Sequence, residues 1–219
     1  MSDLLEKLPH GNPLASTMNG KFTHLRDIQS TISDLKKSGL TPDELGKILD
    51  HNDEFCQWVT PRLAAAFADR LSKKSFPKLQ QLVSDISGCQ AEALDLIGYK
   101  PLWRLILDSL SDALETAEAE SSTKPLSAWK KLYLTKDAHD QPILRDQTVS
   151  TKLRAVMQVY YDYLVAMQAA ELYDYDDMIL RVVHAMEVFA ELRYDLQETY
   201  QYILVDEFQD TNDAQMRLI

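Results

Sequence analysis

The spacing of apolar residues along the chain is mostly helical. Apolar side chains recur every three or four residues between Pro101 and Ala119, which predicts an amphipathic helix. A second stripe of this kind begins at Leu153, and Ser150 or Thr151 can cap that helix. Further helices are predicted at residues 22–38 and from residue 42 onward, followed by shorter helical segments over 53–98 that are broken near Pro61 and Pro77. Near the end of the chain, one helix is predicted from YDYDD to about Phe189 and another at 190–198. The pattern therefore predicts a mainly α-helical fold.

Two neighbouring helix boundaries are marked by the residues between 38 and 44. Gly39 follows the first predicted helix, at the position where a left-handed residue commonly ends a helix. Thr41 can cap the next helix, Pro42 suits its first position, and Glu44 completes a capping box. By contrast, residues 1–21 resemble a loose N-terminal segment, and residues 137–148 a loop or a small hairpin.

The hydrophobic period changes near the end of the sequence. Tyr202 to Val205 form a continuous apolar run, which is typical of a central parallel strand covered on both faces. Such a strand needs partner strands, and nothing upstream in the sequence resembles a set of them. We therefore expect one short strand and a following helix, attached to a mainly helical chain.

Length, charge and cysteine content narrow the class of protein. A chain of 219 residues fits one domain with an appendage, and 45% apolar residues can form a core. A net charge of −11 argues against nucleic-acid binding by the whole surface, but it leaves room for a basic face. The two cysteines and five histidines have no metal-ligand spacing. Cys56 and Cys89 fit a reducing compartment, with a single disulfide left open.

The sequence has no feature of a secreted or membrane-bound protein. Its first ten residues carry acids where a signal peptide needs basic and then apolar residues. No apolar run approaches the roughly 18 residues that cross a membrane. We expect a soluble, cytoplasmic protein without a membrane partner.

Acidic residues follow the apolar run at the end of the predicted strand. In open α/β sheets chemistry gathers at the carboxyl ends of parallel strands, and Asp206 and Glu207 stand at such an end. An aspartate there can hold a magnesium ion, while a neighbouring carboxylate orients or deprotonates an attacking water. The alternative is structural: a buried strand is followed by acids that cap a helix starting near Asn212.

The residues around this acidic pair give a more specific signal. The sequence ILVDEFQDTNDAQ closely resembles the DExx box, or Walker B motif, of UvrD/Rep-type superfamily 1 DNA helicases. The matching positions are Val205, Asp206, Glu207, Gln209, Asp210, Thr211, Asn212 and Gln215. Upstream, LYDYDDMILRVV resembles the aromatic-Asp-Asp-Leu-Leu stretch of the same family, and STISDLKKSGLTPDEL resembles the start of its helical 1B subdomain.

The resemblance implies a domain organisation for the chain. Residues 22–172 would form a helical 1B-like subdomain, which the family inserts in a RecA-like α/β core. Residues 173–219 would form a partial segment of the first RecA-like domain, 1A, with the DExx box. Only a short strand-helix piece of the core would then be present.

A P-loop is absent from the sequence. That motif needs Gly-x4-Gly-Lys-Ser/Thr, because its backbone amides and lysine cradle the phosphates. The two Gly-Lys pairs, at Gly20 and Gly46, have Ala15 and Thr41 five residues earlier, and neither lysine is followed by Ser or Thr. We therefore expect the chain to be a middle piece of a helicase that does not hydrolyse ATP by itself.

For the complete parent protein the resemblance implies ATP-dependent DNA unwinding. The cofactors would be ATP and Mg²⁺, and the partners would be single-stranded DNA, duplex junctions and the remainder of the helicase chain. Translocation would run 3′ to 5′ on single-stranded DNA, in repair, replication or recombination.

The resemblance also assigns roles to individual residues. Asp206 would help to hold magnesium, and Glu207 would activate water. Gln209 would sense the γ-phosphate or couple the nucleotide state to DNA, while Asp210 would support the loop structurally. The pair Asp176–Asp177 matches the acidic pair of the family, with helix capping as its favoured role.

Lysines alternate with aromatic residues between Ser121 and Lys136. This composition is typical of a single-strand DNA track, because lysines bind phosphates and rings stack on bases. The candidate contacts are Lys124, Trp129, Lys130, Lys131, Tyr133 and Lys136. A second basic stretch runs from Arg62 to Lys78. The alternative, favoured for any single residue, is a solvated amphipathic helix whose Trp129 and Leu132 face the core.

Two other functions stay open. A helical protein-interaction module with a vestigial DExx motif would fit the acidic balance and the missing P-loop, but the unbroken match from Val205 to Asn212 disfavours it. A helicase-nuclease of the same superfamily would share the features of this chain. Sequence beyond residue 219 would separate it from a helicase, since a nuclease domain would lie there.

Overall fold

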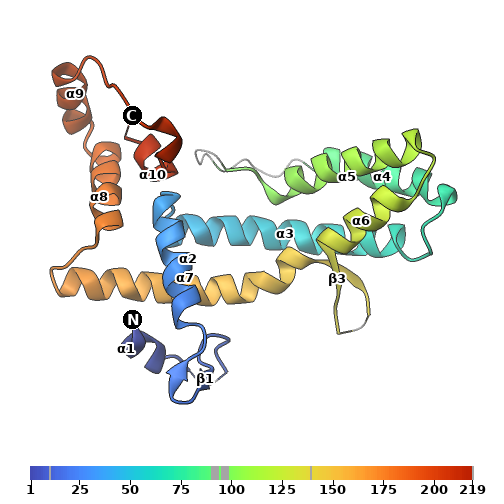
Figure 1. Cartoon of the computed structure of the whole chain (residues 1–219), viewed down its shortest axis with the longest axis horizontal. Helices are drawn as coiled ribbons and strands as arrows, with labels where there is room; N and C mark the ends of the chain where they lie inside the picture. Colours follow the sequence, from blue (N-terminus) through green and yellow to red (C-terminus); the bar gives the residue numbers. More distant parts are fainter. Residues whose placement is uncertain (10, 90–93, 95–98, 139, 219) are drawn as a thin grey trace. The chain divides into compact units, whose positions relative to one another are not determined.

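The computed structural model describes residues 1–9, 11–89, 94, 99–138 and 140–218. Helices account for most of these residues, and the strands form two short antiparallel hairpins (Figure 1). The chain divides into two compact units: residues 1–46 with 153–219 form unit 1, and residues 47–152 form unit 2. The long helices α3 (Pro42–Ala66) and α7 (Arg145–Ala169) contribute residues to both units. The mainly α prediction is confirmed, and none of the described helices is long and apolar enough to cross a membrane.

Unit 1 gathers short elements from both ends of the chain. Outside the long helices these are α1 (Ser2–Glu6), β1 (Thr17–Met18), β2 (Lys21–Phe22), α2 (Leu25–Lys37), α8 (Tyr175–Val188), α9 (Ala190–Thr199), η2 (Phe208–Asp210) and α10 (Asp213–Met216). The buried members of its apolar cluster are Leu5, Leu14, Ile28, Ile32, Val156, Val159 and Tyr160. Residues 1–21, expected as a loose segment, thus contain a helix and a strand pairing, and two of their leucines lie in this cluster.

The turn between α2 and α3 follows the predicted boundary signals. Gly39 has a φ of +71°, and its amide donates to the Lys36 carbonyl at 2.9 Å, which ends α2 in a left-handed turn. Thr41 and Glu44 form the predicted capping box: the Thr41 amide donates to Glu44 Oε2 at 2.8 Å, and the Glu44 amide donates to Thr41 Oγ1 at 3.2 Å.

Unit 2 packs helices and one hairpin around its own core. Outside the long helices its elements are η1 (Lys73–Ser75), α4 (Phe76–Ser87), α5 (Leu102–Ala119), α6 (Lys124–Tyr133), β3 (Leu134–Lys136) and β4 (Pro142–Leu144). The helix predicted between Pro101 and Ala119 and the helix break near Pro77 are confirmed, since α5 and α4 occupy these positions. A hairpin forms near the segment predicted at 137–148, but its strands are β3 and β4, with Thr135 opposite Ile143, and residues 145–148 already belong to α7. The fully buried core residues of unit 2 include Val59, Leu63, Leu79, Ile86, Ile106, Leu110, Leu126 and Leu144.

Three predicted helix boundaries are wrong. α3 continues through Pro61, because core residues on both sides of it are fully buried, and this packing outweighs the hydrogen bond that proline removes. α7 begins at Arg145, directly after β4, so Ser150 lies inside the helix and caps nothing. α2 begins at Leu25, because Phe22 pairs in the first hairpin. Residues 90–93 and 95–98 of the helical stretch predicted over 53–98 lie outside the described residues.

Both cysteines are free thiols, so the single disulfide left open by the sequence is not formed. Burial, with smaller contributions from the charges of Asp146 and Asp53, raises the pKa of the Cys56 thiol to about 12. A thiol with so high a pKa is a weak nucleophile at neutral pH. Cys56 is therefore a core side chain of unit 2.

Candidate functional site

The predicted site acids lie in an exposed loop. Residues 202–205 form no strand in the described part of the chain, and Leu204 is 97% exposed. The strand prediction for Tyr202–Val205 is therefore wrong here. A central strand needs neighbours for its backbone groups, and the described residues offer only two short hairpins.

Local backbone geometry brings Asp206, Glu207 and Gln209 together. Glu207 has a φ of +50°, so the chain turns sharply before η2. The Glu207 amide donates to Asp206 Oδ1 at 3.0 Å, and Gln209 Nε2 donates to the Glu207 carboxylate. The Asp210 amide donates to the Glu207 carbonyl at 2.8 Å and closes the turn. Both acidic residues are thus exposed, and within the described part of the chain their side-chain hydrogen bonds are to residues of their own loop.

The donor set at this loop fits part of a magnesium site. Magnesium takes oxygen ligands and is usually bound through one or two carboxylates together with substrate phosphates and water. Asp206 and Glu207 supply such oxygens, but no group of three or more His, Cys, Asp or Glu residues in the described part of the chain could hold a metal ion. The loop can therefore supply two carboxylates as oxygen ligands, which is fewer than a complete site needs.

The end of the acidic motif has a structural role. Asn212 caps α10: the Gln215 amide donates to Asn212 Oδ1 at 2.9 Å, and the Asn212 amide donates to Gln215 Oε1 at 3.0 Å. These reciprocal bonds form a capping box. A helix cap is present at this position, as the structural alternative predicted, although an asparagine rather than an acid provides it.

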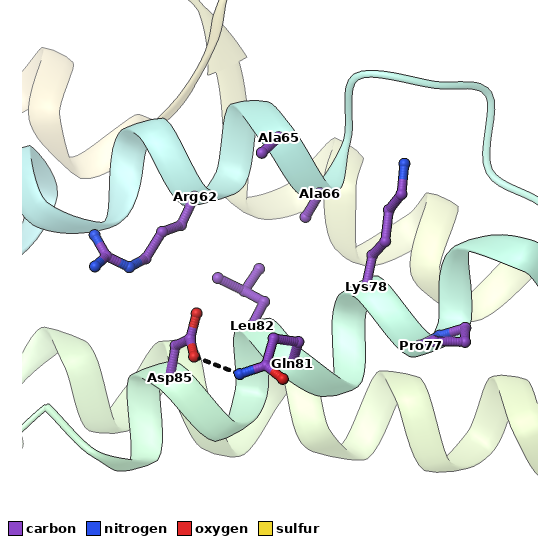
Figure 2. Close-up of a pocket in the computed structure, with 8 residues that line it drawn as sticks. All are labelled: Arg62, Ala65, Ala66, Pro77, Lys78, Gln81, Leu82 and Asp85. Carbon is purple, nitrogen blue, oxygen red and sulfur yellow. Dashed lines mark hydrogen bonds between the residues drawn. The ribbon is translucent and has the colours of Figure 1, made fainter.

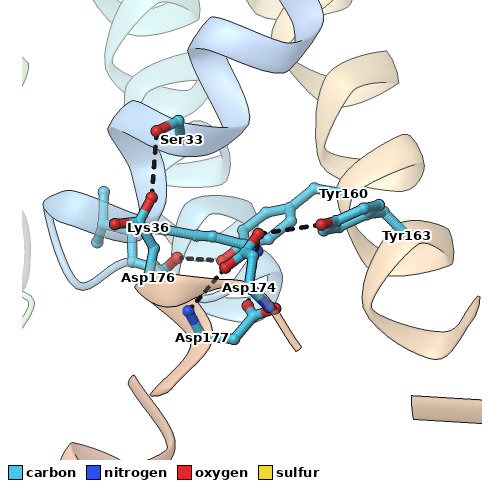
Figure 3. A network of polar contacts seen from close by, with 8 residues as sticks. Ser33, Lys36, Tyr160, Tyr163, Asp174, Asp176 and Asp177 are labelled. Carbon is cyan, nitrogen blue, oxygen red and sulfur yellow. Dashed lines mark hydrogen bonds and ion pairs between the residues drawn. The ribbon is translucent and has the colours of Figure 1, made fainter. Parts of the chain in front are cut away.

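A buried ion network lies between α2 and α8 (Figure 3). Lys36 is 1% exposed, and its Nζ lies 2.7 Å from Asp174 Oδ2 and 2.6 Å from Asp177 Oδ1. The same ammonium lies 4.6 Å from the centre of the Tyr163 ring, whose hydroxyl donates to Asp174 at 3.0 Å. A buried ammonium needs this pairing, because removing it from water otherwise costs several kcal/mol.

The two carboxylates that bind Lys36 also start α8. The Asp177 amide donates to Asp174 Oδ1 at 2.9 Å, and the Asp174 amide donates to Asp177 Oδ2 at 3.1 Å. Capping, the favoured role of the pair Asp176–Asp177, is thus seen directly for Asp177. Asp176 lies in the first turn and accepts a hydrogen bond from Ser33 Oγ at 3.2 Å.

Lys36 was missed by the sequence reasoning, although the sequence contains a signal. It follows Ile28 and Ile32 at intervals of four residues, on the face of α2 that is buried. A lysine on a buried apolar stripe is normally paired with a carboxylate. The acids of YDYDD were candidates for that partner.

The network shifts the pKa values of its members. Burial alone would raise the pKa of Asp174, but the hydrogen bonds from Lys36, the Asp177 amide and Tyr163 lower that pKa below its usual value. Burial and the bond to Asp174 raise the pKa of Tyr163 to about 12. Burial and the nearby carboxylates, Asp177 first, also raise the pKa of Tyr160. The network therefore keeps Asp174 charged and both tyrosines neutral at neutral pH.

The predicted DNA contacts lie on α6 and the β3–β4 hairpin of unit 2. Lys130, Lys131 and Lys136 line a groove of about 610 Å³ together with Arg145, which the sequence reasoning missed. Among the described lining residues the acid is Asp140, which pairs with Lys136 at 2.6 Å. Arg145 lies beside the lysines because the hairpin brings the chain back to α6. There Arg145 Nη2 donates to the Lys131 carbonyl at 3.1 Å. The groove thus carries an excess of positive charge.

Trp129, predicted as a base-stacking contact, is a buried side chain in this structure. It is 4% exposed, and its ring centre lies 5.8 Å from that of Phe67 and 5.2 Å from that of Tyr133. Its indole N–H donates to Ser109 Oγ at 3.0 Å. The alternative, in which Trp129 faces the core, is confirmed, whereas Leu132, expected beside it, is 66% exposed.

A second groove, of about 580 Å³, lies between α3 and α4 at the other basic stretch (Figure 2). Arg62 covers the Trp58 ring at 4.0 Å and donates to the Trp58 carbonyl at 2.7 Å. Lys78 pairs with Asp69 at 3.1 Å, and Asp85 also lines the groove. The described lining of this groove has two cations, Arg62 and Lys78, against Asp85, so its positive excess is smaller than that of the first groove.

Comparison with known proteins gives a consistent set of relatives. A family model described as UvrD/REP helicase N-terminal domain matches residues 3–219. The ATP-dependent DNA helicase UvrD1 of Mycobacterium leprae is 30% identical over 131 residues, which cover 59% of this chain and 14% of that protein. A component of an ATP-dependent helicase/nuclease from Lactococcus lactis is 23% identical over 212 residues, which cover 90% of this chain and 15% of that protein. The ATP-dependent DNA helicase PcrA of Staphylococcus aureus is 39% identical over 64 residues, 29% of this chain and 9% of that protein.

These relatives are much longer than the region that matches. The chain spans between 9% and 15% of the length of the three proteins. No solved structure matches the chain.

Proposed function

The chain belongs to the family of UvrD/REP helicase N-terminal domains, and we propose that it acts as part of an ATP-dependent DNA helicase. The observation that carries the proposal is the unbroken acidic motif from Val205 to Asn212, inside a family match that covers residues 3–219. Relatives named ATP-dependent DNA helicase support it. Because the chain spans a small part of their length, unwinding is proposed for the longer protein that contains this sequence.

In this proposal residues 22–172 are a 1B-like helical subdomain and residues 173–219 are a segment of the first RecA-like domain. Exposed apolar side chains around the acidic loop support the second assignment: Tyr202 is 88% exposed, Leu204 97% and Phe208 58%. Such a set normally marks a surface that another part of the protein covers. The remainder of a RecA-like core would cover it and give Tyr202–Val205 its partner strands.

The acids of the loop would take part in ATP hydrolysis. Asp206 would hold Mg²⁺, which when bound neutralises charge on the ATP phosphates. Glu207 would accept a proton from the attacking water, and Gln209, which already bonds the Glu207 carboxylate, would orient it and sense the γ-phosphate. Since the sequence has no P-loop, the 219-residue chain alone is proposed to be inactive as an ATP hydrolase.

DNA would meet unit 2 at the basic groove. Lys130, Lys131, Lys136 and Arg145 present cations on one surface, and each such cation can neutralise a backbone phosphate. Lys124, exposed at the start of α6, would extend this surface. Translocation along single-stranded DNA from 3′ to 5′ belongs to the same proposal.

Binding to a labelled single strand tests the groove. Lys130→Glu with Lys131→Glu should weaken DNA binding by the longer protein and reduce the salt slope of log K by about 2. The matched control is Lys7→Glu with Lys21→Glu, two exposed lysines of unit 1 outside both basic stretches. Equal effects of the two double variants would remove the groove from the proposal.

ATP turnover by the longer protein, with and without single-stranded DNA, tests the function. The expected result is stimulation by DNA, and a loss of about 100-fold or more in the Glu207→Gln variant, since removing a general base typically costs this much. A folded protein without stimulation would overturn the helicase proposal and favour a helical interaction module with a vestigial motif.

A helicase-nuclease is the second candidate, because the helicase/nuclease relative from Lactococcus lactis aligns over 90% of this chain. It shares the ATPase expectation, so a separate readout is needed. Cleavage of linear duplex DNA by the longer protein in the presence of ATP and Mg²⁺ would favour this candidate. Unwinding without cleavage would favour the plain helicase.

A further inference from the structure

Arg217 connects the helix behind the acidic loop to two other elements of unit 1. Its Nη1 donates to the Gly39 carbonyl at 2.6 Å, and its Nη2 forms an ion pair with Glu187 near the end of α8. Glu44, in the first turn of α3, lies 3.9 Å from the same nitrogen. The Arg217 side chain is 17% exposed and its bond to Gly39 is partly buried, whereas Glu187 is 51% exposed. A guanidinium that bonds a carbonyl and a carboxylate at once has a fixed orientation.

The contact at Gly39 is close enough to depend on that glycine. A Cβ built on Gly39 would lie 3.1 Å from Arg217 Nη1, 3.2 Å from Arg217 Cδ and 3.5 Å from Ala214 Cα. Ala214, in α10, is 2% exposed. The α2–α3 turn and the helix that carries Arg217 are therefore in direct contact.

The acidic loop itself has no such anchor among its described side-chain bonds. Asp206, Glu207 and Gln209 bond only within the loop, and all three are exposed. Past Asn212 the chain enters α10 and reaches Arg217, the first long side chain after the motif with bonds to distant elements. The fixed end of the loop is thus its carboxyl end.

We propose that Arg217 is a positioning residue, which holds the acidic loop in register by clamping α10 to the α2–α3 turn and to α8. The inference rests on the proposed function, because the loop matters for catalysis only if Asp206 and Glu207 serve ATP hydrolysis. Arg217 itself touches no reacting atom in this assignment. Its effect would pass through α10 to the placement of the two carboxylates.

The clamp also ties the loop to α3. Two of the three partners, Gly39 and Glu44, flank the start of that helix. A displacement of the first turn of α3 would therefore alter the contacts of Arg217, and a displacement of α10 would alter them equally, because such coupling is reciprocal.

Amide hydrogen exchange in the 219-residue chain tests the clamp without any nucleotide. The amides of Gln215, Met216 and Arg217 are hydrogen-bonded in and after α10, so their exchange reports its opening. Arg217→Met should speed their exchange about tenfold, since it removes bonds to a carboxylate and a carbonyl. Arg217→Lys should give an intermediate rate, because an ammonium keeps the positive charge but lacks the two planar N–H donor groups of the guanidinium. Arg193→Met, which removes an exposed arginine of α9, is the matched control and should change nothing.

Turnover by the longer protein separates positioning from plain stability. With Arg217→Met, kcat for ATP should fall about tenfold while KM for ATP stays within about twofold, because in this proposal most nucleotide contacts would come from outside the acidic loop, whereas water activation depends on where Glu207 lies. Unchanged exchange at α10 would overturn the proposal, and so would faster exchange with an unchanged kcat. If the unaltered longer protein lacks ATPase activity, the proposed function fails, and exchange then shows whether the clamp exists as a structural device only.

Discussion

The Lys36 network and the acidic loop both gather carboxylates in unit 1, but in opposite surroundings. Asp174 and Asp177 each bind a fully buried ammonium and cap a helix. Asp206 and Glu207 are exposed, and among the described residues their side chains bond within their own loop. The first pair is occupied by the fold, whereas the second is free for a ligand. The sequence alone does not show whether a pair of acidic residues is structural or free for a ligand. That depends on whether the fold places a cation beside the pair.

The largest expected effect comes from removing the buried cation. Lys36→Met leaves Asp174 and Asp177 without their partner and should lower the free energy of unfolding of unit 1 by about 3–5 kcal/mol. Urea denaturation measures this change. The neighbouring Lys37 is exposed, and Lys37→Met should stay within about 0.5 kcal/mol. Similar losses in both variants would mean that the network contributes nothing beyond a surface charge.

The second-largest expected loss of stability comes from Gly39, in the turn between α2 and α3. Gly39→Ala places a Cβ on a residue with φ +71° and brings it within 3.1 Å of Arg217, so it should cost about 1–2 kcal/mol. Gly88→Ala is the matched control, since Gly88 has φ −81° and its nearest atom would be 3.6 Å away. Thermal unfolding of the two variants, side by side, gives the comparison. A tolerated alanine at position 39 would contradict the close approach of Arg217.

Acidic pH should lower the stability of the chain by a smaller amount, through protonation of Asp174 in the Lys36 network. The pKa of Asp174 is lower in the folded chain than its usual value, so the unfolded chain binds the proton more readily at acid pH. The stability linked to this shift is present above about pH 4 and is lost as the pH falls through the folded pKa. The melting temperature should therefore fall between about pH 5 and about pH 3, and it should fall less in Lys36→Met, where the shift has lost its main charge partner. An equal fall in both proteins would rule out this linkage.

The smallest expected effect lies in the acidic loop. Asp206→Asn with Glu207→Gln should change the free energy of unfolding of the 219-residue chain by less than about 0.5 kcal/mol, because both side chains are exposed. Chemical denaturation checks this value. A loss above about 1 kcal/mol would show that these acids stabilise the fold and would weaken their assignment to chemistry.

Local signals in the sequence were sufficient where a structure depends on neighbouring residues. Gly39 and the Thr41–Glu44 box were predicted and are present, because a left-handed turn and a capping box involve only a few consecutive residues. The amphipathic stripe of α5 was predicted for the same reason. The acidic motif was identified as a string of residues, and its loop geometry is also local.

Predictions failed where residues far apart in the sequence determine the local structure or the burial of a side chain. α3 passes through Pro61 because the unit 2 core holds it, and Trp129 is buried because Phe67 and Tyr133 cover its ring. The run Tyr202–Val205 has the composition of a central strand, but no neighbouring strand is present in the described residues, and the run is irregular and exposed.

The sequence by itself determined the helical character of the chain, its local caps and the identity of the acidic motif, since these depend on side chains a few residues apart. Only the tertiary structure showed that Lys36 meets Asp174 and Asp177, that Arg145 joins the lysines of α6, and that Arg217 reaches Gly39. Each of these contacts joins residues 14 to 178 positions apart in the chain. Such pairings depend on how buried apolar surfaces bring helices together; residue spacing can show which face is buried, as at Lys36, but not which distant residue meets it.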